Sequence, residues 1–166
     1  AAMNRSLGQE VPVEDAFLAI TGYLLKGTDL IDALLERIAN SGRSKNLILQ
    51  AASIRSIENQ LVDPALRPSA IHSQLKKHDP HIIVATRALT SNIRLAEILG
   101  RELNEFRHAL TNITATDLLE MGVPEGPAIG AILEVLETNA LDYPETTQDG
   151  QVTLVKEWLQ NYHTQD

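Results

Sequence analysis

The sequence contains no cysteine, which excludes disulfide bonds and cysteine-ligated zinc. No apolar run is long enough to span a bilayer and no secretory signal is visible, so we expect no contact with a membrane. Aromatic residues make up only 4% of a chain that is 43% hydrophobic. The core must therefore be aliphatic, which is typical of layered helices. The lack of cysteine also fits a reducing compartment, and we expect a cytoplasmic protein.

Residues that could carry catalysis are missing as well. There is no Asp-x-Asp pair, and no glycine-rich phosphate loop follows a strand. His78 and His81 lack a third and a fourth ligand at a suitable spacing, so the pattern does not favour a metal site. We therefore expect no active site and no cofactor within this chain.

What is present is a helical pattern. Apolar residues recur at three- and four-residue steps along nearly the whole sequence, which predicts an all-α multi-helix bundle of about eight or nine helices. A long helical stretch over 80–110 is expected to break near Thr90 and Ser91, and a polar link over 143–150 should precede the last helix. The residues expected in the core are Leu34, Ile48, Ile54, Leu99, Leu119, Ile132 and Leu136.

The most informative segment, residues 112–142, predicts a C-terminal helical hairpin. Thr114 is the expected N-cap of its first helix, with Asp117 three residues later in a capping-box arrangement. Gly122 should end that helix with a positive φ, and Pro127 suits the first position of the next one. Gly126 lies in the turn between them. Gly130, one turn into the second helix, is expected to allow close approach of another backbone.

This segment resembles the C-terminal region of the tRNA nucleotidyltransferase and poly(A) polymerase family. A second, shorter stretch, RPSAIHSQL over 67–75, resembles the P-S-x-I-Y-x-x-L element of the same family, with His72 where an aromatic residue is usual. The matching residues of the hairpin segment are Thr116, Asp117, Leu118, Leu119, Gly122, Val123, Gly126, Pro127, Ile129, Gly130, Ile132, Leu133, Leu141 and Asp142.

The resemblance implies a non-catalytic, tRNA-binding C-terminal region. Members of the family add CCA or A to RNA 3′ ends with an N-terminal head that uses Mg²⁺ and ATP or CTP. That head has no counterpart here, so the implied partners are tRNA or another RNA 3′ end and the catalytic head itself. We expect residues 1–12 to be an artificial scar or a linker, residues 13–111 a helical body with the RNA-binding face, and residues 112–166 the hairpin and tail.

Charge is segregated along the chain, although the net charge is −8. Residues 1–36 carry a net charge of −4, residues 37–111 carry +5 and residues 112–166 carry −9. Such asymmetry indicates a polyanion partner for the basic part. Within this part Arg87, Arg94 and Arg101 recur every seven residues. On one helix this spacing gives a stripe that could follow a phosphate backbone. The residues expected to contact RNA are Arg43, Lys45, Arg87, Arg94, Arg101 and Arg107.

Alternatives remain at each of these positions. Glu97 and Glu105 lie at helical spacing from the arginines, as on an ordinary solvated helix. The glycines of the hairpin could present backbone N–H groups to a phosphate, but the acidic residues around them favour a purely structural turn. Trp158 and Tyr162 could stack on a base or simply bury the last helix. For the whole chain, the alternatives are a protein-interaction or dimerisation module, including a homodimer, and a DNA-binding helix-hairpin-helix protein.

Overall fold

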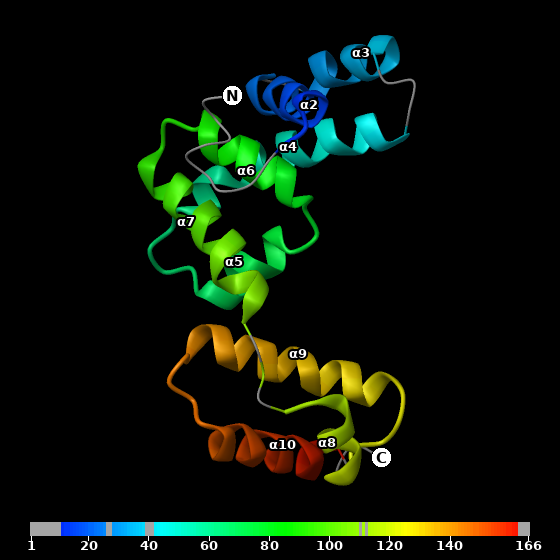
Figure 1. The fold of residues 1–166 in the computed structure, drawn as a ribbon, viewed down its shortest axis with the longest axis vertical. Coiled ribbons are helices and arrows are strands. Elements are labelled where there is room, and N and C mark those ends of the chain that lie inside the picture. Colours follow the sequence, from blue (N-terminus) through cyan, green and yellow to red (C-terminus); the bar gives the residue numbers. More distant parts are fainter. Residues whose placement is uncertain (1–10, 26–27, 39–41, 110, 112, 163–166) are drawn as a thin grey trace. The chain divides into compact units, whose positions relative to one another are not determined.

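The structure is a computed structural model that describes residues 11–25, 28–38, 42–109, 111 and 113–162. Within these residues the protein is all-α, with nine α-helices, one short 3-10 helix and no β-strand, which confirms the predicted fold class (Figure 1). The elements are α2 (Val13–Leu24), α3 (Thr28–Ile38), α4 (Gly42–Leu61), α5 (Pro68–Leu75), α6 (Pro80–Leu89), α7 (Ile93–Asn104), η1 (Phe106–His108), α8 (Ala115–Glu120), α9 (Pro127–Asp142) and α10 (Gln148–Tyr162).

The chain folds as two compact units. Among the described residues, the first consists of those up to Leu66 together with Ala70–Arg107, and the second consists of Arg67–Ser69 together with those from His108 onward. The second unit thus includes a short stretch that is distant in sequence, at the start of α5. Each unit has its own hydrophobic core.

In the first unit α2 packs on α4 and α6, and α6 packs on α7 (Figure 1). The crossing of α2 and α4 is close because Gly22 lies directly against the backbone of Ile48, where an added Cβ would overlap the carbonyl oxygen. Gly130, for which we expected such an approach, has no atom within 4 Å of an ideal Cβ. That expectation is wrong, because Gly130 lies on the exposed side of α9.

The second unit is a small helical bundle. Helices α9 and α10 run antiparallel and α8 packs on α9 (Figure 1). Ile132 and Leu136 of α9 are fully buried, and Ile129 and Leu133 pack against the same cluster, so the predicted apolar face of this helix is confirmed. Trp158 of α10 is partly buried against this cluster and stacks on Tyr162, with ring centroids 4.9 Å apart.

Most of the predicted core residues are buried. Ile48, Ile54, Leu99, Ile132 and Leu136 have no exposed surface, as expected. The predicted burial of Leu119 is wrong, because 41% of its surface is exposed while its neighbour Leu118 is fully buried. Helix α8 has only six residues, so one position faces the core and the next one in sequence points about 100° away from it. Leu34 lies outside the described side chains.

Local signals account for most helix ends. Asp79 caps α6 by accepting a hydrogen bond from the His81 amide, and Asn92 caps α7 after the expected break, which lies between Leu89 and Ile93. The last helix begins at Gln148, before the end of the expected polar link. The reason is that the Thr147 hydroxyl accepts a hydrogen bond from the Gly150 amide at 3.3 Å and so caps α10.

Candidate nucleic-acid interface

The two segments that carry the family resemblance meet at Asp142. One carboxylate oxygen of Asp142 accepts the Ser69 backbone N–H at 2.9 Å, and the other accepts the Ser69 hydroxyl at 2.8 Å. Both residues belong to the second unit, and 73 positions separate them in sequence. Ser69 is the second residue of α5, where a backbone N–H has no acceptor within its own helix. Asp142 therefore caps α5 from the last residue of α9, and Arg67 approaches the same carboxylate at 4.0 Å.

The hairpin turn has the predicted geometry. Thr114 and Asp117 form a capping box, and the hydrogen bonds from Thr114 lower the pKa of Asp117. Gly122 and Gly126 have φ values of 91° and 98°, which favour glycine, and Pro127 opens α9. Val123 between them is buried, so the turn is anchored in the core of the second unit.

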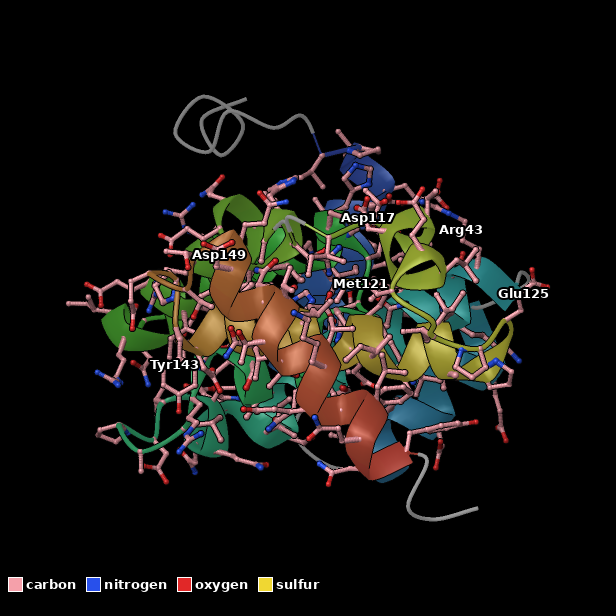
Figure 2. All side chains as sticks on the ribbon, turned by 90° about the horizontal axis from the view of Figure 1, so that it is seen from below. Arg43, Asp117, Met121, Glu125, Tyr143 and Asp149 are labelled. Carbon is pink, nitrogen blue, oxygen red and sulfur yellow. The ribbon has the colours of Figure 1, made fainter. Side chains whose placement is uncertain are left out.

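The outside of the hairpin is acidic. Figure 2 shows Glu125 in the turn between α8 and α9, and Glu120 and Glu134 are exposed on the adjoining helices. Gly126 caps α9 without a side-chain hydrogen bond, and an added Cβ at Gly122, Gly126 or Gly130 would meet no atom within 4 Å. The backbone at the turn is therefore accessible, although the carboxylates around it oppose the approach of a phosphate.

The arginine series is divided between two helices. Arg94 and Arg101 lie two turns apart on α7, whereas Arg87 lies on α6 because the chain leaves the helix between Leu89 and Ile93. The guanidinium of Arg87 reaches back to α7, where it would lie only 3.1 Å from a Cβ added at Gly100. The three residues therefore gather around α7 without forming the single-helix stripe that the spacing predicts.

Arg94 and Arg101 keep exposed guanidinium groups. Arg94 donates its Nε to the carbonyl of Val62 at 2.9 Å. Arg101 donates its Nε to Glu105 at 2.9 Å and lies 4.7 Å above the centroid of the Phe106 ring. An exposed pair of this kind contributes little to stability and is easily exchanged for another anion. Both arginines therefore remain accessible to solvent.

Arg107 holds the end of α5 in place. Its Nε donates to Glu102 at 3.0 Å, and one Nη donates to the carbonyls of Leu75 and His78 at 3.1 and 2.5 Å. Glu102 is completely buried, and its other oxygen lies 3.0 Å from Nδ1 of His72. The position where the family usually has an aromatic residue is therefore occupied here by a buried, hydrogen-bonded ring. Only 18% of the Arg107 side chain is exposed.

Arg43 is paired with a buried carboxylate. Both of its terminal nitrogens donate to Asp15 at 2.7 Å, and this interaction lowers the pKa of Asp15 despite the burial of the carboxyl group. Nδ1 of His81 lies 3.0 Å from the same carboxylate. The Arg43 side chain, labelled in Figure 2, nevertheless remains 58% exposed. Lys45 is exposed and forms no ion pair with the described side chains.

Sequence reasoning missed Asp15 and Glu102 as buried anions. A signal for Glu102 was present, since it lies on the apolar face of α7 formed by Leu95, Leu99 and Leu103. Asp15 similarly interrupts the buried face of α2. A charged residue at an apolar position predicts a buried pair, but the sequence does not reveal the partner.

Comparisons with protein families, with curated proteins and with solved structures give no match for this chain. Within the described residues no group of three or more histidine or acidic side chains is arranged to hold a metal ion. None of the described helices combines the length and the apolar composition that a membrane span requires.

Proposed function

We propose that this chain is the tRNA-binding C-terminal region of a cytoplasmic tRNA nucleotidyltransferase or poly(A) polymerase. In this proposal a catalytic head, using Mg²⁺ and ATP or CTP, extends the RNA 3′ end. The present chain holds the body of the RNA and carries no catalytic group.

One observation supports the proposal more than any other. The two segments that resemble the family are far apart in sequence, yet Ser69 of the first and Asp142 of the second form two hydrogen bonds. A chance resemblance in two separate stretches gives no reason for the matching residues to bond to each other. A shared fold does, because the serine and the aspartate would then be retained together as a cap and its acceptor.

The RNA contact is proposed at Arg94 and Arg101, which are exposed on one helix and about 10 Å apart along its axis. A guanidinium offers several donors in one plane, so each can bind a phosphate while it keeps part of its present contacts. Arg87 and Lys45 are secondary candidates. Arg43 and Arg107 are already paired with the buried carboxylates of Asp15 and Glu102. They contribute to RNA binding mainly by stabilising the fold.

The net charge of the whole chain opposes RNA at long range, so we expect weak, salt-sensitive binding. The test is titration of tRNA with the wild type, Arg94→Gln and Arg101→Gln over a salt series. Each lost phosphate contact should reduce the slope of log affinity against log salt by about one unit. Lys156→Gln is the matched control, because it removes one exposed positive charge from α10, in the acidic second unit.

Two further arms distinguish the alternatives. Gly130→Glu adds a charge beside the hairpin at a position with free space, so it tests the hairpin without disturbing the fold. Loss of binding in this variant alone would place the RNA on the hairpin and contradict the arginine site. If tRNA does not bind, or a DNA duplex binds equally well, the proposed function is wrong. Incubation of the chain with tRNA, ATP, CTP and Mg²⁺ should leave the RNA 3′ end unextended.

A further inference from the structure

One arginine of the first unit lacks a hydrogen-bond partner in the part of the chain that the structure describes. It is Arg87, which forms neither a hydrogen bond nor an ion pair there. The other arginines with described side chains all reach an acceptor: Arg43, Arg55, Arg101 and Arg107 donate to carboxylates, Arg94 donates to the Val62 carbonyl, and Arg67 lies 4.0 Å from Asp142. Arg87 is half-buried and permanently charged, so its unused donors call for an explanation.

The Arg87 side chain is held against the neighbouring helix. Arg87 lies in the last turn of α6, and its guanidinium covers the buried Gly100 of α7. A Cβ added at Gly100 would lie 3.1 Å from Cζ, 3.2 Å from Nε and 3.3 Å from one Nη. Because Cζ is the nearest of the three atoms, the guanidinium turns its flat face to Gly100 and not its edge. Its N–H donors lie in that plane, so none of them points at the backbone of α7 beneath it.

Gly100 provides the space for this arrangement. Glycine inside a helix is about 1 kcal/mol less favourable than alanine. Gly100 does not have the positive φ that requires glycine at other positions, so the absence of a side chain matters here for space. Its carbonyl accepts Nδ2 of Asn104 at 2.9 Å and does not bind Arg87. The position at Gly100 therefore seats the guanidinium without neutralising its charge.

We propose that Arg87, seated on Gly100, is a phosphate-binding site of the first unit. With one face of the guanidinium packed, the donors along its edge are fixed in direction and match two oxygens of a phosphate. The nitrogens of Arg87 are not among the buried polar atoms that lack a partner, so an anion can reach them from solvent. A phosphate is favoured over a carboxylate because residues 37–111 carry a net charge of +5 and the phosphate brings more negative charge.

The site is distinct from the exposed arginines of α7. Positions 94 and 101 point about 120° and 100° away from position 100 around the helix axis. One carboxylate on this side opposes the phosphate. Glu97 lies one turn before Gly100, about 60° around the axis, and forms no ion pair with the described side chains. Glu97→Gln should therefore strengthen phosphate binding about twofold.

NMR titration with inorganic phosphate tests the site. The Nε–H resonance of Arg87 is identified by its absence from Arg87→Gln. Sodium phosphate is added from about 0.5 to 50 mM at neutral pH, while sodium chloride keeps the ionic strength constant. Two charge-assisted hydrogen bonds to one fork give weak binding, so this resonance should shift to saturation with a Kd on the order of 5 mM. A shift that does not saturate, or that chloride alone reproduces, would overturn the proposal.

Two variants keep the positive charge and change only the geometry. Arg87→Lys loses the planar fork, and its Kd, followed by the backbone amides around residue 87, should rise about tenfold. Gly100→Ala adds a Cβ that displaces the flexible end of Arg87 without touching backbone, so the Kd should rise at least threefold in a folded protein. Gly130→Ala is the matched control, because it makes the same change in open space on α9 and should leave the Kd unchanged. Wild-type affinity in both charge-keeping variants would show that no fixed fork is used.

The source of the phosphate is distinguished by titrating tRNA into the wild type and Arg87→Lys. Weaker tRNA binding by the variant assigns the site to the RNA backbone, and equal binding assigns it to a free phosphate or a small phosphate ester. The site does not rest on the proposed RNA contact, because inorganic phosphate is the probe. A chain that binds phosphate at Arg87 but no tRNA would contradict the proposed function alone, and tRNA binding without a phosphate-dependent shift at Arg87 would contradict this site alone.

Discussion

Arg107 donates its Nε to Glu102 at 3.0 Å, at a point where the carboxylate has no exposed surface. The same arginine closes the C-terminal end of α5 through the carbonyls of Leu75 and His78. The pair thus fixes α5 to α7 within the first unit. A buried carboxylate of this kind stabilises the fold only while its partners are present.

Replacing the Glu102 carboxylate should therefore destabilise the protein. Glu102→Gln leaves Arg107 without its counter-charge and is expected to lower the free energy of unfolding by about 3 kcal/mol. Urea denaturation followed by circular dichroism measures the change. The control is Glu105→Gln on the same helix, whose pair with Arg101 is exposed and should contribute less than about 1 kcal/mol. Similar losses in the two variants would contradict the structural role of Glu102.

The cap at Ser69 should be visible in amide exchange. Asp142→Ala removes the acceptor of the Ser69 N–H, and a lost cap typically costs about 1 kcal/mol. The exchange rate of that amide, measured by NMR, should rise about fivefold or more. Glu145→Ala, an exposed carboxylate nearby in sequence, should leave the rate unchanged. An unchanged rate in Asp142→Ala would exclude the cap.

Two glycine substitutions should have opposite effects. Gly22→Ala places a methyl group against the Ile48 carbonyl and is expected to destabilise the protein by about 3 kcal/mol. Gly130→Ala meets open space within a helix and should stabilise it by up to about 1 kcal/mol. Thermal denaturation of both variants gives the comparison. A tolerated Gly22→Ala would mean that α2 and α4 can separate at little cost.

Protonation of His78 should make the stability of the fold depend on pH, with a loss of stability in acid. Burial lowers the pKa of its ring, and Nε2 lies 3.0 Å from the Ser53 hydroxyl. Below about pH 6.5 the unfolded chain takes up a proton at this residue while the folded protein does not, so stability declines as pH falls through that window. The contribution is at most about 1.4 kcal/mol per pH unit.

The measurement is the free energy of unfolding at pH 7.5 and at pH 5.5, for the wild type and for His78→Gln. Because glutamine does not titrate, the variant should lose less stability between the two values. The other histidines are common to both proteins and cancel in the difference. Equal losses would show that His78 does not couple folding to protonation.

Several features could be predicted from the sequence because they depend on neighbouring residues. The capping box of Thr114 and Asp117, the positive φ of Gly122 and the break after Leu89 each follow from contacts within a few positions. Burial of Ile48 and Leu136 followed from the period of the helix. Arg87, Arg94 and Arg101 were found in the same way, as a repeat along the chain, whereas Arg43 and Arg107 were chosen because residues 37–111 carry a net positive charge.

The sequence by itself determined the all-α fold, most helix ends and the basic middle segment, because helix formation and capping are governed by nearby residues. Only the tertiary structure decided which charged side chains already have a hydrogen-bond partner. The bonds of Asp15 to Arg43 and of Asp142 to Ser69 join residues that are remote in sequence. It also decided that Leu118 rather than Leu119 faces the core, and that Gly22 rather than Gly130 meets another backbone. These outcomes depend on how helices pack, and packing is set by all their side chains together.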